Sequence, residues 1–175
     1  VSRTVNRLRT GLISQNVPGE LIFFVTNACN FRCKHCFNRN LGSGSNDLSL
    51  KEIEEVLLSL NGKKILNLLI SGGEPFIRDD LVEIISLFVT YCDTSKVVIP
   101  TNGYLTDKIV EMVKEMASKH NKVSFRINIS LDGMPDYHNT IRGNEHSFEN
   151  SINTIKQIQA LRMPNVEAST ICTIT

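Results

Sequence analysis

Short β-rich apolar runs alternate with helical segments along the sequence from Leu21 onward, and this alternation constrains the fold more than any other feature. The β-rich runs lie at residues 21–26, 65–70, 96–101, 123–131 and 166–175. Between them, apolar residues recur three and four positions apart, which is the spacing of an amphipathic helix. Repeated strand–helix–strand units connect through right-handed crossovers and give a parallel sheet. The sequence therefore predicts an α/β fold with about five βα units.

Capping residues indicate where the helices begin, and the lengths of the loops indicate which end of the sheet carries the site. Ser49 and Glu52 have the spacing of a capping box, and further helices are expected to begin near Asp80, Thr106 and Ser147. The connections after the first and fourth strands are longer than a minimal unit needs. Both follow the carboxyl end of a strand, where α/β proteins place their active sites.

The fourth run alternates strictly between apolar and polar residues. Its apolar members are Phe125, Ile127, Ile129 and Leu131, and its polar members are Arg126, Asn128 and Ser130. A parallel strand covered on both faces is apolar throughout, so alternation indicates a curved sheet with one face lining a polar cavity. An edge strand with one solvated face is the alternative. Five units are too few for an eight-stranded barrel, so we expect an open partial (β/α) barrel.

Three cysteines, Cys29, Cys33 and Cys36, lie within eight residues directly after the first strand. Cysteines this dense in a chain without disulfide character are typical ligands of soft metals. An iron–sulfur cube ordinarily takes four thiolates, so three from one loop would leave one iron open to another molecule. A structural zinc site that includes His35 is the alternative, although zinc pairs normally come from two separated knuckles.

The composition excludes several classes of protein. The 175 residues are 41% hydrophobic and 21% charged, which suits one sizeable globular core. A net charge of +1 and the absence of Trp argue against nucleic acid as a partner, and no apolar stretch is long enough to span a bilayer. Cys92 and Cys172 are isolated and are expected to be buried core residues. The clustered thiols indicate a reducing compartment, so we expect a cytoplasmic protein with no membrane partner.

Residues 1–20 are predicted to be an N-terminal extension, and residues 21–175 the core. The extension carries Arg3, Arg7 and Arg9 without an acidic residue before Glu20, a composition that faintly resembles a transit peptide. A short helix outside the first strand is the favoured interpretation, because Pro18 and Gly19 then turn into that strand. The chain stops within a predicted strand, so we expect it to be truncated at its C-terminus.

The second strand ends in the motif Ser71-Gly72-Gly73-Glu74-Pro75. Two glycines allow a sharp turn and leave backbone N–H and C=O groups accessible to a ligand. Glu74 is expected to place a carboxylate at the mouth of the cavity. Taken alone, the motif favours a plain turn before a helix.

Together these motifs resemble the radical S-adenosylmethionine (radical SAM) superfamily. The cysteine loop fits its C-x3-C-x2-C pattern, and Gly72–Pro75 fits its GGEP motif. Thr101-Asn102-Gly103 and Ser130-Leu131-Asp132-Gly133 are similar to family sequences at the later strand ends. Residues 138–143 and 147–149 resemble the SPASM/twitch-type branch, which often modifies peptides and carries auxiliary clusters.

The resemblance implies a 4Fe–4S cluster on Cys29, Cys33 and Cys36, with S-adenosylmethionine chelated at the open iron. The implied contacts to that cofactor are His35 at the adenine, Gly72, Gly73 and Glu74 at the amino group, Ser130 and Arg142 at the carboxylate, Thr101 and Asn102 at the carboxylate or ribose, and Asp132 at the ribose. For Arg142, a surface pair with Asp136 or Glu145 is the alternative.

The implied function is reductive cleavage of S-adenosylmethionine to a 5′-deoxyadenosyl radical, which abstracts hydrogen from a substrate. A peptide is the favoured substrate because of the region around Arg142, and a nucleotide and a small metabolite are the alternatives. A flavodoxin or ferredoxin is the implied electron donor. The alternatives are a non-catalytic iron–sulfur carrier, which would need a fourth cysteine, and a zinc-binding module. Because the family core normally has six βα units, we expect this stretch alone to be weakly active or inactive.

Overall fold

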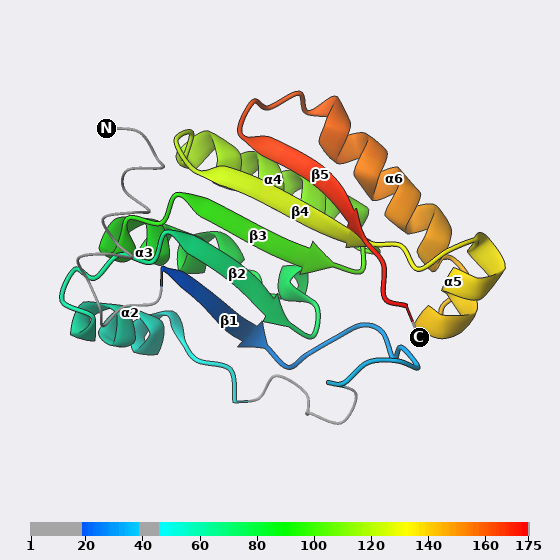
Figure 1. Ribbon diagram of the computed structural model, residues 1–175, viewed down its shortest axis with the longest axis horizontal. Helices are drawn as coiled ribbons and strands as arrows, with labels where there is room; N and C mark the ends of the chain where they lie inside the picture. The colour runs from blue at the N-terminus through cyan, green and yellow to red at the C-terminus, as the bar shows by residue number, and fades with distance from the viewer. Residues whose placement is uncertain (1–18, 39–45, 175) are drawn as a thin grey trace.

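The computed structural model describes residues 19–38 and 46–174, in which five parallel strands form one sheet (Figure 1). The strands follow the order of the sequence and are β1 (Glu20–Thr26), β2 (Asn67–Gly72), β3 (Lys96–Thr101), β4 (Ser124–Ser130) and β5 (Val166–Ile171). The helices are α2 (Leu50–Ser59), α3 (Leu81–Cys92), α4 (Thr106–Lys119), α5 (Pro135–Arg142) and α6 (Ser147–Ala160), with a 3₁₀ turn η1 (Pro75–Ile77). The predicted α/β architecture is confirmed. The helix expected in the N-terminal extension lies outside the described residues.

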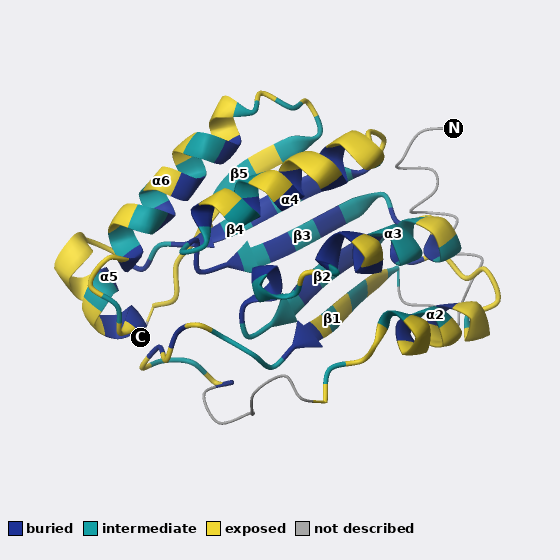
Figure 2. Ribbon diagram, turned by 180° about the vertical axis from the view of Figure 1, so that it is seen from behind, coloured by how far each residue is buried: buried dark blue, intermediate teal, exposed yellow. Residues whose placement is uncertain are grey.

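Helices α3, α4 and α6 pack on one face of the sheet, as the views from the two sides show (Figures 1 and 2). The side chains that point to this face are buried on β2, β3 and β4, and those between them are only partly covered. On β4, Phe125, Ile127 and Ile129 are at most 1% exposed. Since β4 pairs with both β3 and β5, the interpretation of its alternation as an edge strand is wrong.

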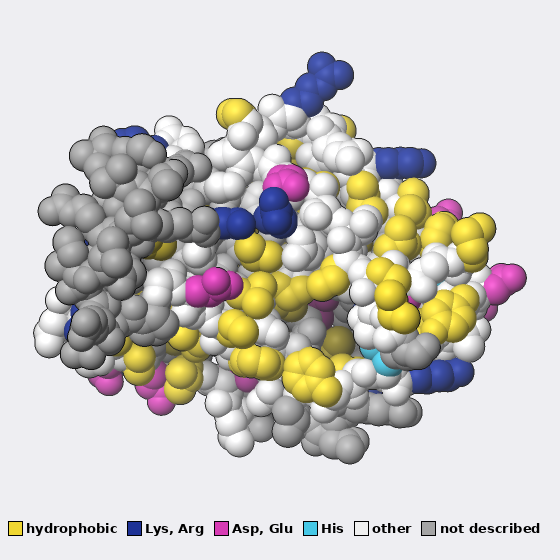
Figure 3. Space-filling model, in the orientation of Figure 1, with side chains coloured by type: hydrophobic (Ala, Val, Ile, Leu, Met, Phe, Trp, Pro, Cys, Tyr) yellow, Lys and Arg dark blue, Asp and Glu magenta, His cyan; other side chains and the backbone are white. Residues whose placement is uncertain are grey.

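Strand register defines what the opposite face carries. Ile22 pairs with Leu69, Leu69 with Val98, Val98 with Arg126, and Arg126 with Glu167, so these side chains form one row across the sheet. No helix of the described residues covers this face, and Figure 3 shows hydrophobic side chains gathered on it. Arg126 and Glu167 form an ion pair of 2.9 Å at its polar end. This row is therefore apolar over β1–β3 and polar over β4–β5.

Helix α2 starts as the sequence predicts. The backbone N–H of Glu52 donates to Ser49 Oγ at 3.3 Å, and the N–H of Ser49 donates to Glu52 Oε2 at 2.8 Å, which completes the capping box. Asp80 precedes α3 but does not cap it, because its carboxylate pairs with Arg78 at 2.6 Å. Helices α4 and α6 begin at Thr106 and Ser147.

Three details differ from the sequence-based expectations. The loop after β4 contains an unpredicted short helix, α5, which begins at Pro135 and ends before Gly143 in the left-handed region (φ 70°). The ladder of β2 begins at Asn67, because the N–H of Ile65 donates to Cys92 in α3 instead of to a strand. Cys92 is buried as predicted, but Cys172 is exposed because it lies beyond the last residue of β5. Among the described residues, no helix is long and apolar enough to cross a membrane.

Candidate functional site

A cavity of about 280 Å³ lies where the strands end and collects nearly all of the predicted site residues. It is lined by eleven of the twelve, namely Cys29, Cys33, His35, Cys36, Gly72, Gly73, Glu74, Thr101, Asn102, Ser130 and Arg142. Asp132 is the exception: it does not line the cavity, but it accepts a hydrogen bond from Arg142, which does. Residues up to 113 positions apart therefore share one site because parallel strands all end at the same edge of the sheet.

The cysteine loop is held against the glycine turn by backbone hydrogen bonds. The N–H of Gly73 donates to Thr26 at 2.8 Å, and that of Glu74 donates to Ala28 at 2.9 Å. A Cβ on Gly73 would lie 2.0 Å from the carbonyl oxygen of Ala28, so no larger residue fits there. The glycine allows the two backbones to approach each other, in addition to any access that it gives a ligand.

The three clustered thiols present a donor set that fits a cluster with three protein ligands. The N–H of Phe31 donates to Cys29 Sγ at 3.4 Å, and Arg142 Nη1 donates to Cys33 Sγ at 3.9 Å. Burial raises the pKa of the Cys29 and Cys33 thiols, although Phe31 and Arg142 respectively oppose that change. Thiolate sulfurs of an iron–sulfur centre commonly accept such hydrogen bonds, which influence its reduction potential.

The geometry gives no support to the zinc alternative. Among the described residues, no three His, Cys, Asp or Glu side chains converge as the ligands of a single ion. The ligands of an iron–sulfur cube each bind a different iron, so they need no common centre. The nearest charged partner of His35 is Asp132, whose Oδ2 lies 4.0 Å from His35 Nε2. His35 Nδ1 is buried without a hydrogen-bond partner.

Glu74 is a buried link between strand ends rather than a carboxylate at the cavity mouth. It is 1% exposed, and its oxygens accept hydrogen bonds from Thr101 Oγ1 at 2.8 Å, the N–H of Asn102 at 2.7 Å and the N–H of Phe76 at 3.2 Å. Burial raises its pKa to about 7, which these hydrogen bonds and the charge of Arg142 only partly oppose. Glu74 thus ties the turn after β2 to the end of β3.

The side chains of Thr101 and Asn102 are also engaged within the protein. Thr101 Oγ1 donates to Glu74 and accepts from the N–H of Gly103 at 3.1 Å. Asn102 donates to Asn30 at 2.7 Å and accepts from the N–H of Tyr104 at 2.9 Å. These contacts bind the third strand end to the cysteine loop and favour a supporting role for both side chains.

Asp132 and Arg142 form a buried ion pair beside the cysteine loop. Arg142 Nε donates to Asp132 Oδ2 at 2.6 Å, and the N–H of Thr173 donates to Asp132 Oδ1 at 3.0 Å. Burial acts to raise the pKa of Asp132, but its hydrogen bonds and the charge of Arg142 outweigh burial and lower that pKa. Arg142 therefore pairs with Asp132, and the pairing with Asp136 or Glu145 is wrong.

Several residues of the lining were not predicted from the sequence to be site residues. They are Phe31, Phe37, Ser71, Pro75, Pro100, Ile171 and Thr173. The alternation along β2 and β3 would have identified Ser71 and Pro100 as residues of the open face. Phe31 packs edge to face on Tyr104 with ring centroids 5.3 Å apart, and no sequence signal marks that contact.

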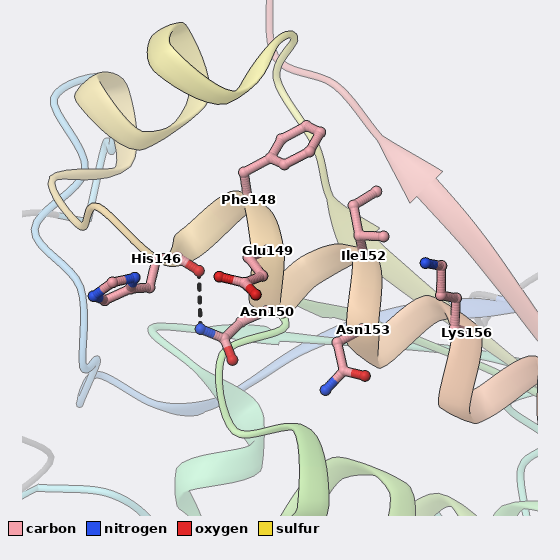
Figure 4. Close-up of a pocket in the computed structure, with 7 residues that line it drawn as sticks. All are labelled: His146, Phe148, Glu149, Asn150, Ile152, Asn153 and Lys156. Carbon is pink, nitrogen blue, oxygen red and sulfur yellow. Dashed lines mark hydrogen bonds between the residues drawn. The ribbon is translucent and has the colours of Figure 1, made fainter.

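A second hollow of about 570 Å³ follows the outer side of α6 and is separate from the strand-end cavity (Figure 4). Its lining comes from one stretch of chain, His146–Lys156, and shares no residue with the first cavity. The amide of Asn150 donates to the carbonyl of His146 at 2.8 Å, as the dashed line in Figure 4 shows. No cysteine lies there, so the predicted chemistry belongs to the strand-end cavity.

Comparison with curated proteins finds a GTP cyclase and a maturation protein among the relatives of this chain. GTP 3′,8-cyclase of Microcystis aeruginosa is 34% identical over 125 residues, which are 66% of this chain and 35% of the relative. Sporulation killing factor maturation protein SkfB of Bacillus subtilis is 26% identical over 167 residues, which are 93% of this chain and 38% of the relative. The chain thus spans little more than a third of the length of these relatives.

Solved structures share the fold. SuiB of Streptococcus suis, bound to precursor peptide SuiA, matches with a TM-score of 0.69 at 18% identity, over 99% of this chain and 38% of SuiB. The enzyme anSMEcpe, with bound S-adenosylmethionine and the Kp18Cys peptide, matches with a TM-score of 0.68 at 20% identity, over 87% of this chain and 42% of that one. The sequence model of the radical SAM superfamily matches residues 23–175. With its three-cysteine loop and GGEP turn in one cavity, this chain belongs to the radical SAM superfamily.

Proposed function

We propose that this chain is the cofactor-binding core of a radical SAM enzyme that modifies a peptide. The observation that carries the proposal is the single cavity that Cys29, Cys33 and Cys36 share with Gly73, which follows β2, and with Arg142 at the end of α5. Neither of the two remaining cysteines lines that cavity. A 4Fe–4S cluster and S-adenosylmethionine are the cofactors of this superfamily, and the three-thiol donor set fits them.

The roles that we propose follow from the position of each group. Cys29, Cys33 and Cys36 would hold the cluster, while Ser130 and Arg142 offer hydroxyl and guanidinium donors to the carboxylate of S-adenosylmethionine. When both cofactors are bound, they supply a 5′-deoxyadenosyl radical that removes a hydrogen atom from the substrate. The remaining contribution of the chain is to orient these groups and to exclude water.

The contacts of Glu74, Thr101 and Asn102 supply that orientation. They join the ends of β2 and β3 to each other and to Asn30 in the cysteine loop. A buried network with every partner present holds its members in one arrangement. We therefore assign these three side chains to positioning the site, and the backbone of residues 72–74 to the amino group of S-adenosylmethionine.

The extent to which relatives and solved structures match this chain supports a peptide over a nucleotide as substrate. SkfB, a maturation protein, aligns with 93% of this chain, whereas GTP 3′,8-cyclase of M. aeruginosa aligns with 66%. The solved structures of SuiB and anSMEcpe contain peptides, and SuiB matches 99% of this chain in fold.

The family model begins at residue 23, which supports a core that starts near residue 21 after an N-terminal extension.

A small acidic electron carrier, a flavodoxin or ferredoxin, is the proposed electron donor. Arg32 and Lys34 flank Cys33 and are both exposed, so they offer positive charge close to the proposed cluster. Complementary charge raises the rate at which two proteins associate. We propose a cytoplasmic protein, because such a donor and an oxygen-sensitive cluster need a reducing compartment.

The test uses the complete protein, reconstituted with iron and sulfide without oxygen. With a reductant, it should convert S-adenosylmethionine to 5′-deoxyadenosine, and a variant with all three clustered cysteines changed to alanine should not. A protein that binds one zinc and no iron, or that holds a cluster but forms no 5′-deoxyadenosine, would contradict the proposal. Precursor peptides from neighbouring genes should increase the yield, and an increase with GTP alone would identify a nucleotide enzyme instead.

A further inference from the structure

The guanidinium of Arg142 contacts two buried groups at once, one on each side. Its Nε donates to Asp132 Oδ2 at 2.6 Å, and its Nη1 lies 3.9 Å from Cys33 Sγ. The residue is 8% exposed and Asp132 is 5% exposed, so little water separates the charges. A positive charge is therefore held beside one of the three cysteine sulfurs.

Independent contacts fix Arg142 relative to Cys33. Asp132 is held by the N–H of Thr173, and its own N–H donates to Nδ1 of the buried His138 at 3.1 Å. The N–H of Lys34, next to Cys33, donates to the carbonyl of Ile141, next to Arg142, at 2.8 Å. The loop and the end of α5 are thus joined both through backbone and through side chains.

We propose that Arg142 is a positioning residue that raises the reduction potential of the cluster through Cys33, and that Asp132 holds it in place. This inference rests on the proposed function, because it requires a cluster on the three cysteines. A reduced cluster carries more negative charge than an oxidised one, so a donor and a positive charge beside its sulfur stabilise the reduced form. The low dielectric of a buried site strengthens that effect.

The proposal is compatible with a contact from Arg142 to S-adenosylmethionine and extends beyond it. A guanidinium has five N–H donors in a fixed fork, and the contacts to Asp132 and Cys33 use two of them. Arg142 also lines the cavity, so its other donors are available to a carboxylate there. One side chain would then connect the cofactor carboxylate to a cluster sulfur.

The test is a redox titration of the complete, reconstituted protein, monitored by the electron paramagnetic resonance of the reduced cluster. It is made without S-adenosylmethionine, so loss of a carboxylate contact cannot produce the result. We expect Arg142→Gln to shift the potential to a more negative value. Arg142→Lys should give a smaller shift in the same direction, because lysine lacks the fork that spans Asp132 and Cys33.

The control is Arg126→Gln, which removes an arginine from another carboxylate pair, with Glu167, on the open face of the sheet. The cluster of this control should have the same reduction potential as that of the wild type. An unchanged reduction potential in an Arg142→Gln protein that contains a complete cluster would overturn the inference. If Arg142→Gln fails to bind iron, an unchanged reduction potential in Arg142→Lys would likewise overturn it. Failure of the wild type to form a cluster would instead refute the proposed function.

Discussion

The backbone N–H of Asn102 donates a 2.7 Å hydrogen bond to the buried carboxylate of Glu74, and this contact joins the ends of β2 and β3. The same carboxylate accepts from Thr101 and from the N–H of Phe76. Three donors favour the ionised form, while complete burial opposes it. Burial has the larger effect and raises the pKa of Glu74 to about 7.

This raised pKa predicts a stability that falls as the pH rises. Between the ordinary pKa of 4.5 and the folded-state pKa of about 7, the folded chain keeps a proton that the unfolded chain has released. The contribution of Glu74 to the free energy of unfolding should therefore be largest below about pH 4.5. It should be smaller by about 3 kcal/mol at pH 7 and above. Urea unfolding at about pH 5 and about pH 8 measures the difference. Glu74→Gln should be less pH-dependent, and an equal dependence in both proteins would contradict this prediction.

Gly73→Ala should disrupt the contact between the glycine turn and the cysteine loop. The added Cβ would meet the carbonyl oxygen of Ala28 at 2.0 Å and Cys29 Cβ at 3.0 Å, so the loop must move. We expect a loss of about 1–3 kcal/mol in stability and a marked loss of bound iron. Gly19→Ala is the control, because a Cβ at Gly19 has no neighbour within 4 Å. Thermal unfolding and iron analysis measure both effects, and equal results for the two variants would argue against the expected clash.

Cys33→Ala should lose about four irons per chain after reconstitution, because the cluster would lose one of its three protein ligands. Cys92→Ala provides the matched control. Cys92 is fully buried in α3, so its loss should reduce stability while leaving the iron content unchanged. Iron and sulfide analysis distinguishes the variants, and a similar loss of iron from both would show that Cys33 has no special role.

Thr154→Val should destabilise the packing of α6 against the end of β3. Thr154 is fully buried, donates to the carbonyl of Gly103 at 2.7 Å and lies 2.7 Å from the hydroxyl of Thr106. Valine has a similar shape but leaves both groups without that partner, which should cost about 1–3 kcal/mol. Thr90→Val on the exposed side of α3 should change the free energy of unfolding little, and an equal cost there would contradict the argument.

Reversing the charges of Arg32 and Lys34 should slow reduction of the cluster by an acidic electron carrier. Both side chains are exposed beside Cys33, and their replacement by glutamate would turn attraction into repulsion. We expect the rate of reduction by reduced flavodoxin to fall about tenfold at low salt, with a smaller difference at high salt. Lys114→Glu on the exposed side of α4 is the control. A rate that does not depend on Arg32 and Lys34 would place the docking surface elsewhere.

The sequence predicted those parts of the fold that depend on the period of apolar residues and on the lengths of the loops. The alternation of Phe125 through Ser130 indicated which face helices cover, and the loop lengths located the site at the strand ends. The direction of individual side chains depends on long-range partners, which no local pattern records. Asp132 was therefore assigned to a ribose, whereas its oxygens bind Arg142 and the N–H of Thr173. Helix α5 was missed because few of its residues are apolar.

The period-two pattern of β4 also guards against mispairing. A slip of one residue against β3 would turn Arg126 and Asn128 toward the helices, and Ile127 and Ile129 toward the face that the helices leave uncovered. Such a chain would bury a cation without a partner and expose two large hydrocarbon groups, so the misaligned pairing is strongly disfavoured. The alternation that brings Ser130 to the strand-end cavity thereby also selects the correct alignment of β4 during folding.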